Sequence, residues 1–251
     1  MQKLNVFIYG VISYLIFFIT FLYAIGFVGN IFVSKGIDTG EPGNLTTSVI
    51  VNIGLLGLFA VQHSIMARQK FKKWLTSFIP IAAERSTYVL FSSLILALLI
   101  WQWKPMPDFV WHIEAQPVRL ILWCVFWLGW LTVLVSTFLV NHFDLFGLRQ
   151  VLLHLTGKEY HHLEFSTPGL YRYVRHPIMS GFLVAFWATP DMTVGHFLFS
   201  VATTGYILVG VFFEEKDLQN FYGEKYTQYQ QEVPKLMPIP KAKPPQAPGS
   251  K

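Results

Sequence analysis

The sequence predicts an all-α membrane protein, a polytopic bundle of four spanning helices followed by a C-terminal helical hairpin and an amphipathic helix. Of its 251 residues, 53% are hydrophobic and only 13% are charged, whereas average soluble domains contain about 25% charged residues. Four apolar runs are long enough to cross a bilayer, which takes about 17–25 residues. A fifth apolar stretch is longer than one crossing needs. Together these observations indicate a chain that lies largely in lipid.

The four spanning runs cover residues 4–33, 46–66, 86–103 and 117–140. The first is too long and too evenly apolar for a cleaved signal peptide, so we expect it to be retained. Cys124 is the only cysteine and lies inside the fourth run. An internal disulfide is therefore excluded, and we expect a buried, inert thiol.

The fifth apolar stretch, 178–213, is predicted to fold into a hairpin. Thr189-Pro190-Asp191 interrupts it, because proline breaks a helix and aspartate favours a turn. The first arm, 178–189, would reach only about 18 Å at about 1.5 Å per residue. The sequence leaves open whether this arm fully spans the membrane.

Residues 213–232 are predicted to form a single amphipathic helix that ends before Pro234. Its apolar side chains recur at spacings of three and four, with charged residues between them. The aromatic face would lie on the membrane surface or cover a ligand in the bundle, and the two roles are compatible. The apolar positions are Leu218, Phe221, Tyr222, Tyr226 and Tyr229.

Loop charges predict the orientation of the bundle. Five basic residues and one acid lie in 67–85, whereas 34–45 and 104–116 each have one lysine and two acids. Because positive loops stay in the cytoplasm, we expect the N-terminus, 141–177 and everything after 213 on that side. The net charge of +5 then reflects topology and contact with membrane lipids, and it gives no support for nucleic-acid binding.

Dense charge interrupts the apolar pattern at two places on that side. The first is the sequence Gly-Leu-Tyr-Arg-Tyr-Val-Arg-His-Pro at 169–177. Pro177 suits the first turn of a helix, with His176 at the N-cap. The free N–H groups of that turn, with Arg172 and Arg175 before it, would attract a carboxylate or phosphate.

The second place is Glu214-Glu215, at the predicted end of the hairpin's second arm. Two carboxylates at a helix C-terminus near lipid are unfavourable unless a cation or a water-filled cavity receives them. If the hairpin closes, both charged motifs lie side by side and would bind the ammonium and carboxylate of an amino acid. The alternative is that Arg172 and Arg175 simply pair with these acids and with lipid head groups.

Here the motifs resemble a family. The second half of the chain resembles, in the order and spacing of its motifs, the C-terminal signature of the isoprenylcysteine carboxyl methyltransferase and phospholipid methyltransferase superfamily. The matching segments are 171–177, 214–218 and 221–226, with Gly181 between the first two. In the first half, 62–68 and 141–150 resemble bacterial methanethiol S-methyltransferases, which share that half with a nitrite-reduction-associated membrane family. Together the resemblances cover most of the chain.

The resemblance implies S-adenosyl-L-methionine as cofactor, bound in the bundle near its cytoplasmic end, in a bacterial inner membrane. Many relatives have tyrosine two residues after the proline, where this chain has Met179, so a hydroxyl contact is absent there. The resemblance assigns cofactor binding to Tyr171, Tyr173, Arg175, His176, Pro177, Met179, Gly181, Glu214 and Glu215.

A small thiol, most directly methanethiol giving dimethyl sulfide, is the substrate that the resemblance implies. The thiol must lose its proton, so a base is needed. The candidates are His142, Asp144 and His63, with Glu215 as a further one, although a hydrogen-bonded structural role is the alternative for each histidine. We expect no metal site, because no two histidines form a helical pair at spacing four with an acid.

The chain thus divides into transmembrane helices at 1–140, a cofactor-binding methyltransferase region at 141–237 and a proline- and lysine-rich tail at 238–251, expected to be disordered. The enzymatic alternatives are isoprenylcysteine or phospholipid methylation. The non-enzymatic alternative is a membrane factor of the nitrite-reduction-associated type. The sequence leaves the oligomeric state open.

Overall fold

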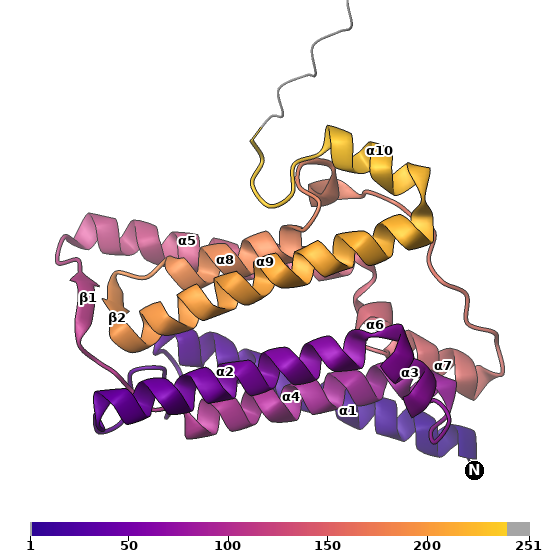
Figure 1. The fold of residues 1–251 in the computed structure, drawn as a ribbon, viewed down its shortest axis with the longest axis horizontal. Helices are drawn as coiled ribbons and strands as arrows, with labels where there is room; N and C mark the ends of the chain where they lie inside the picture. Colours follow the sequence, from indigo (N-terminus) through magenta and orange to yellow (C-terminus); the bar gives the residue numbers. More distant parts are fainter. Residues whose placement is uncertain (1, 240–251) are drawn as a thin grey trace, which may run out of the picture.

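Long apolar helices in two layers make up most of the computed structural model, which describes residues 2–239 (Figure 1). One layer contains α1 (Gln2–Gly29), α2 (Leu45–Ala67) and α4 (Glu84–Gln102), and the other contains α5 (Gln116–Val140), α8 (Pro177–Trp187) and α9 (Val194–Tyr222). Five of the described helices are long and apolar enough to cross a membrane. The predicted all-α membrane bundle is confirmed.

The predicted spanning runs match the observed helices within a few residues, except at the end of the first run. There α1 ends at Gly29, because Asn30 and Phe32 adopt left-handed backbone conformations with φ of 53° and 59°. Residues 30–33 therefore leave the helix. The proposed tail, 238–251, lies outside the described residues apart from its first two.

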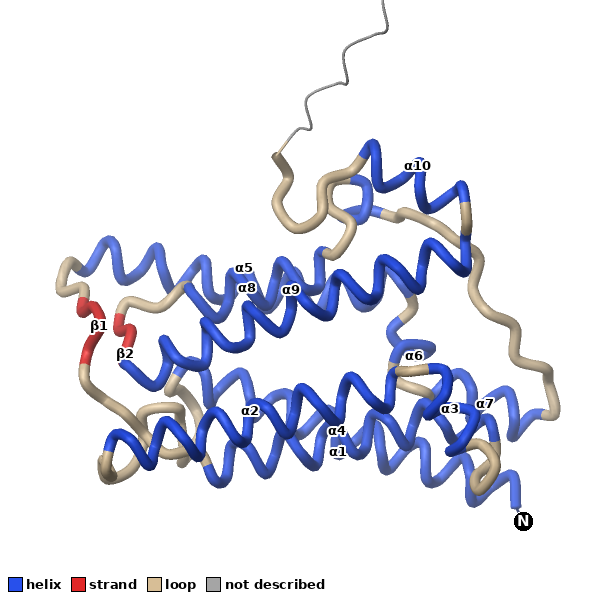
Figure 2. The backbone as a smooth tube through the Cα atoms, viewed as in Figure 1, coloured by secondary structure: helices blue, strands red, loops and turns tan. Residues whose placement is uncertain are grey.

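The predicted hairpin is present, and its first arm is short. Helix α8 has 11 residues, whereas α9 has 29. Between them, β2 (Asp191–Thr193) pairs with β1 (Phe109–His112) in an antiparallel two-stranded sheet, which the sequence analysis did not predict (Figure 2). Arg119 of α5 binds both carboxylate oxygens of Asp191, at 2.8 and 2.7 Å. The turn of the hairpin is thereby fixed to the segment before α5.

Helices α5 and α8 cross at two glycines. A Cβ atom added to Gly181 would lie 2.7 Å from the Gly129 carbonyl oxygen, and one added to Gly129 would lie 2.8 Å from the Gly181 carbonyl oxygen. Small residues let helix backbones approach this closely inside a membrane. The short α8 is thus held against the full-length α5.

The prediction of a single amphipathic helix at 213–232 is wrong. Instead α9 continues to Tyr222, and α10 (Glu224–Glu232) begins after Gly223, whose φ of 61° and ψ of −131° interrupt the helix. Glycine adopts such angles readily. The spacing of aromatic residues continues across the break, which is why periodicity alone missed it. The chain turns at Gly223, so that α10 runs in a new direction at this end of the bundle (Figure 1).

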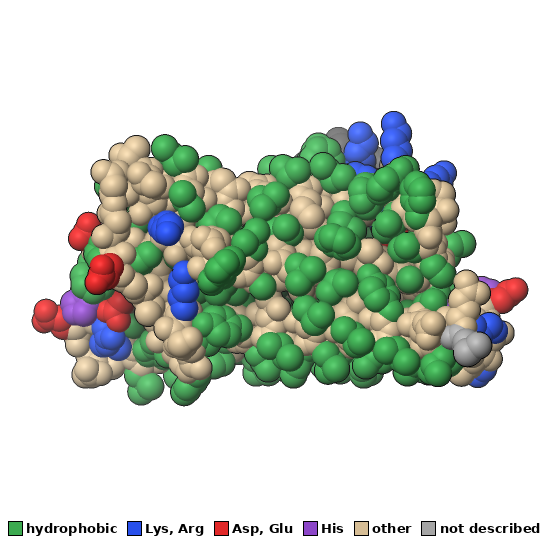
Figure 3. All heavy atoms as spheres, turned by 90° about the horizontal axis from the view of Figure 1, so that it is seen from below, with side chains coloured by type: hydrophobic (Ala, Val, Ile, Leu, Met, Phe, Trp, Pro, Cys, Tyr) green, Lys and Arg blue, Asp and Glu red, His purple; other side chains and the backbone are tan. Residues whose placement is uncertain are grey.

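Short helices gather at the same end of the bundle as α10 (Figure 1). Seen from the α1, α2 and α4 side, apolar side chains cover the middle of the surface and charged ones lie toward the two ends (Figure 3). This distribution suits a bilayer around the middle. The short elements are α3 (Gln69–Leu75), α6 (His142–Leu145), α7 (Leu148–Thr156) and the 3₁₀ turns Ile81–Ala83 and Gly169–Arg172.

Candidate functional site

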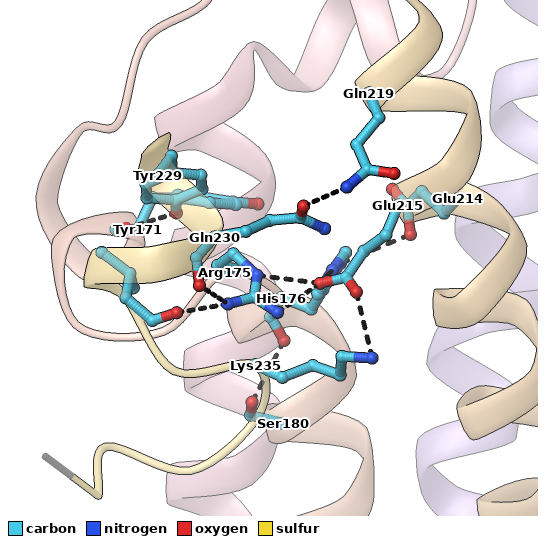
Figure 4. Close-up of polar contacts among 11 residues, drawn as sticks. Tyr171, Arg175, His176, Ser180, Glu214, Glu215, Gln219, Tyr229, Gln230 and Lys235 are labelled. Atoms are coloured by element: carbon cyan, nitrogen blue, oxygen red, sulfur yellow. Dashed lines mark hydrogen bonds and ion pairs between the residues drawn. The ribbon is translucent and has the colours of Figure 1, made fainter. Parts of the chain in front are cut away.

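Glu215 is the centre of a buried cluster of charges (Figure 4). One of its carboxylate oxygens accepts hydrogen bonds from Arg175, at 2.8 Å to Nε and 2.7 Å to Nη2. Its other oxygen lies 3.0 Å from the Lys235 ammonium. The Arg175 and Glu215 side chains are only 5% and 10% exposed. Burial of charge costs several kcal/mol unless each charge is paired, and here two cations share one carboxylate.

His176 connects the two acids. Its Nε2 atom lies 3.2 Å from Glu215 and its Nδ1 atom 3.4 Å from Glu214. Because a carboxylate only accepts hydrogen bonds, the ring can donate to both acids at once only when both of its nitrogens carry a proton. His176 occupies the N-cap position of α8 as predicted, but its side chain makes no capping hydrogen bond. Its ring faces the two acids of α9 instead. These acids do not end the helix as predicted, because α9 continues about two turns beyond them to Tyr222.

Glu214 differs from its neighbour in exposure. Its side chain is 48% exposed, and its one ion pair among the described residues is with His176. Of the two acids, Glu214 is therefore the one that is available to a ligand.

Residues 233–236, which we call the C-terminal strap, hold the cluster together. The backbone N–H groups of Arg175 and His176 donate to the carbonyls of Pro234 and Lys235, at 2.9 and 3.1 Å. Arg175 Nη1 also donates to the Val233 carbonyl, and the Ser180 hydroxyl donates to that of Leu236. The strap therefore crosses the start of α8 directly beside Glu215.

Aromatic side chains of α10 cover the cluster. Tyr226 and Tyr229 are buried against Phe165, with ring centroids 5.9 and 5.4 Å from it. The Tyr229 hydroxyl donates to the backbone carbonyl of Tyr171. Burial raises the pKa of Tyr229 to about 12, so this phenol remains a hydrogen-bond donor at neutral pH. The aromatic face of α10 thus packs on the protein rather than on lipid alone.

The other residues assigned to cofactor binding are more dispersed. Pro177 is buried at the first position of α8, and Met179 is half-buried in the same first turn. Gly181 lies at the crossing with α5, where it serves close packing. Tyr173 is 66% exposed, and Arg172 is exposed and forms no ion pair with the described residues.

His63 belongs to a second polar cluster, between α2, α4 and α9. Its Nδ1 atom lies 3.1 Å from the Ser92 hydroxyl, and its Nε2 atom is hydrogen-bonded to Tyr88. The neighbouring Ser64 hydroxyl lies 3.4 Å from that of Tyr206. Tyr206 belongs to α9, the helix that also carries Glu214 and Glu215, so this cluster contacts the helix of the charged one.

His142 is held firmly by its neighbours. Its ring nitrogens bond to Thr137 at 2.9 Å and to Tyr14 at 2.8 Å, and its ring stacks on Phe138 with centroids 4.4 Å apart. Burial lowers the pKa of His142, so the ring is neutral at pH 7.

Asp144 forms an ion pair with Arg149 at 2.7 Å and accepts a hydrogen bond from Tyr160 at 3.3 Å. Neither it nor His142 has an ion pair with the charged cluster within the described part of the chain. The structure does not bring these two residues to Glu215.

The sequence analysis missed two parts of this site, the strap with Lys235 and the buried phenol of Tyr226. The sequence Val-Pro-Lys-Leu carries no pattern that signals such contacts, since most are made by backbone atoms. Tyr226 was noted only as one position of an apolar face. Within residues 2–239, no group of three or more histidine, cysteine, aspartate or glutamate residues could hold a metal ion.

Comparison with known proteins adds an independent finding. The family model described as NnrU protein matches residues 51–233. The chain is 54% identical over 240 residues to a methanethiol S-methyltransferase of Mycobacterium tuberculosis, covering 96% of this chain and 98% of that protein. It is 53% identical over 236 residues to methanethiol S-methyltransferase 1 of Bradyrhizobium diazoefficiens, covering 94% and 83%. No solved structure matches.

Proposed function

The chain belongs to the NnrU protein family, and on that premise we propose that it transfers a methyl group from S-adenosylmethionine to methanethiol, giving dimethyl sulfide. The observation that carries this proposal is the identity of more than half to proteins of that name over 94–96% of the chain. Five candidate membrane spans make it an integral membrane protein. We place the site on the cytoplasmic side, following the loop charges.

The charged cluster fits the amino-acid part of the cofactor. Glu214, half-exposed and with a single partner, would receive the ammonium group. Arg175 and Lys235 share one carboxylate, so a positive charge is left over for the ligand's carboxylate. His176 would hold Glu214 in place. S-Adenosylmethionine supplies an electrophilic methyl group on a sulfonium when bound.

A thiol must be deprotonated before it can accept the methyl group, because the thiolate is the nucleophile. Of the candidate bases, we favour His63 for this role. His142 and Asp144 are engaged with α1, α5 and α7, whereas the His63 ring lies against Tyr206 of α9, the helix that carries Glu214 and Glu215. A dry site between the helices also favours a reaction in which two opposite charges combine.

The test is to incubate the purified protein with labelled S-adenosylmethionine and a panel of acceptors: methanethiol, hydrogen sulfide, a farnesylated cysteine and phosphatidylethanolamine. We expect gas-phase dimethyl sulfide from methanethiol, at a rate that rises with pH as more thiolate forms, and no labelled lipid or prenylated product. Turnover of farnesylated cysteine at a rate equal to that of methanethiol would overturn the small-thiol assignment.

Replacing His63 tests whether this residue acts as the base rather than as part of the cofactor site. His63→Asn should lower kcat at least tenfold while leaving the affinity for S-adenosylmethionine within about twofold, because only the proton acceptor is lost. The matched control is His142→Asn, which removes a histidine that bonds to Tyr14 of α1 and Thr137 of α5. A larger loss of kcat in the control than in the His63 variant would move the base to His142.

A further inference from the structure

One polar atom in the candidate site has no partner among residues 2–239, the hydroxyl of Tyr226. The side chain is 2% exposed, so water in bulk does not reach it. A buried polar atom without a hydrogen bond is unfavourable, because it has lost its contacts with water and gained none in the protein. By contrast, the equally placed phenol of Tyr229, three residues along the same helix, donates to the Tyr171 carbonyl. The unpaired phenol points to a ligand that accepts its hydrogen bond.

The surroundings define what kind of group this ligand presents. Tyr226 packs with Tyr229 and Val233, and the Val233 carbonyl accepts a hydrogen bond from Arg175, so this side chain lies beside the charged cluster. Burial raises the pKa of Tyr226, so the phenol keeps its proton and acts as a donor. Of the two charged groups in an amino-acid moiety, the ammonium only donates hydrogen bonds, whereas the carboxylate accepts them. An unpaired phenol donor is therefore complementary to the carboxylate.

We propose that the Tyr226 hydroxyl is a cofactor-binding group that donates a hydrogen bond to the carboxylate of the cofactor's amino-acid part, beside Arg175 and Lys235. The proposal rests on the proposed function, because it takes the cofactor to be S-adenosylmethionine. It divides the work at the site between two ends. The carboxylate lies with Tyr226 under α10, and the ammonium lies with Glu214 on α9.

The test compares binding of two ligands by the detergent-purified full-length chain, measured calorimetrically without thiol. The ligands are S-adenosylmethionine and its decarboxylated form, which keeps the ammonium and sulfonium groups. Tyr226→Phe should weaken binding of S-adenosylmethionine roughly tenfold or more, since hydrogen bonds to charged groups are the strong ones. The same substitution should leave binding of the decarboxylated form within about twofold.

Tyr229→Phe is the matched control, because it removes a phenol that already has a partner inside the protein. It should affect the two ligands alike. The melting temperature of the ligand-free protein gives a second, independent readout. Tyr226→Phe should melt at or above the wild-type temperature, because an unpaired hydroxyl is removed, whereas Tyr229→Phe should melt lower.

Equal losses for both ligands in Tyr226→Phe would overturn the assignment to the carboxylate. A drop in melting temperature as large as that of the control would show a structural role and would overturn the proposal as well. If the wild-type chain binds neither ligand, the proposed function itself fails. Binding by the wild type that is unchanged in Tyr226→Phe contradicts this inference alone.

Discussion

Glu214 and Glu215 are adjacent in the sequence, yet they do different work. Successive helical residues point about 100° apart, so the two acids have different surroundings: Glu215 is buried against the strap, and Glu214 is half-exposed. Glu215 has four donor contacts from Arg175, His176 and Lys235. Glu214 has one, to His176. Glu215 therefore organises the site, and Glu214 is available to bind a ligand.

We therefore expect the two Glu→Gln substitutions to separate stability from binding. Glu215→Gln leaves Arg175 and Lys235 without a counter-charge and should cost about 2–4 kcal/mol of unfolding free energy, together with cofactor affinity. Glu214→Gln should cost less than about 1 kcal/mol while lowering cofactor affinity at least tenfold. We expect both variants to insert into the membrane normally. Melting curves then measure the loss of stability, and calorimetry measures the loss of cofactor affinity. Full cofactor affinity in Glu214→Gln would remove its role as ammonium receptor.

At this scale the sequence predicted the charges but not their pairing. Two adjacent carboxylates near lipid predicted a nearby cation, and Arg175 and His176 lie there. The acids are not at a helix C-terminus as predicted, because α9 continues about two turns beyond them to Tyr222. Lys235 could not be foreseen, because its contact with Glu215 depends on where the strap crosses α8. His176 occupies the predicted N-cap position, but that position does not decide which group the ring faces.

Among the elements, the short helix α8 depends on a close crossing with α5. Gly181→Ala would place a methyl group 2.7 Å from the Gly129 carbonyl oxygen, which neither backbone relieves without moving apart. We expect a loss of about 2–3 kcal/mol in stability and reduced cofactor affinity, because α8 begins at the charged cluster. Thermal unfolding and ligand binding check both effects.

Gly205→Ala is the matched control for the glycine crossing. It also lies in a helix of the hairpin, but a Cβ atom there meets nothing within 4 Å. Alanine is favoured over glycine in a helix by about 1 kcal/mol, so this variant should be as stable as the wild type or more so. If both variants unfold alike, the close crossing does not hold α8.

The hairpin and the spanning helices were predictable because hydrophobic length and a proline-centred break are local signals. Two features were not. Strands of three and four residues, β2 and β1, lie 79 positions apart at Asp191 and His112, too far for any local pattern to pair them. The break at Gly223 lay inside an uninterrupted aromatic spacing, and only its backbone angles reveal it.

At the scale of the whole molecule, the loop charges predict that both charged motifs and the strap lie in the cytoplasm. Cysteine labelling tests this orientation in a Cys124→Ala background. In spheroplasts, a membrane-impermeant maleimide should label Glu41→Cys, in the loop after α1, and not Lys158→Cys, in the loop after α7. Both positions are exposed, so both should react after lysis. Labelling of Lys158→Cys in intact spheroplasts would invert the topology.

The strap also bears on when the protein becomes competent during its synthesis. Every spanning helix precedes residues 233–236 in the chain, so the membrane part is complete before the strap leaves the ribosome. A chain cut just before Val233 would keep its helices in the bilayer but lose Lys235 and the carbonyls that hold Arg175 and His176. Cleavage of this short segment by a protease would thus inactivate the site without extracting the protein from the membrane.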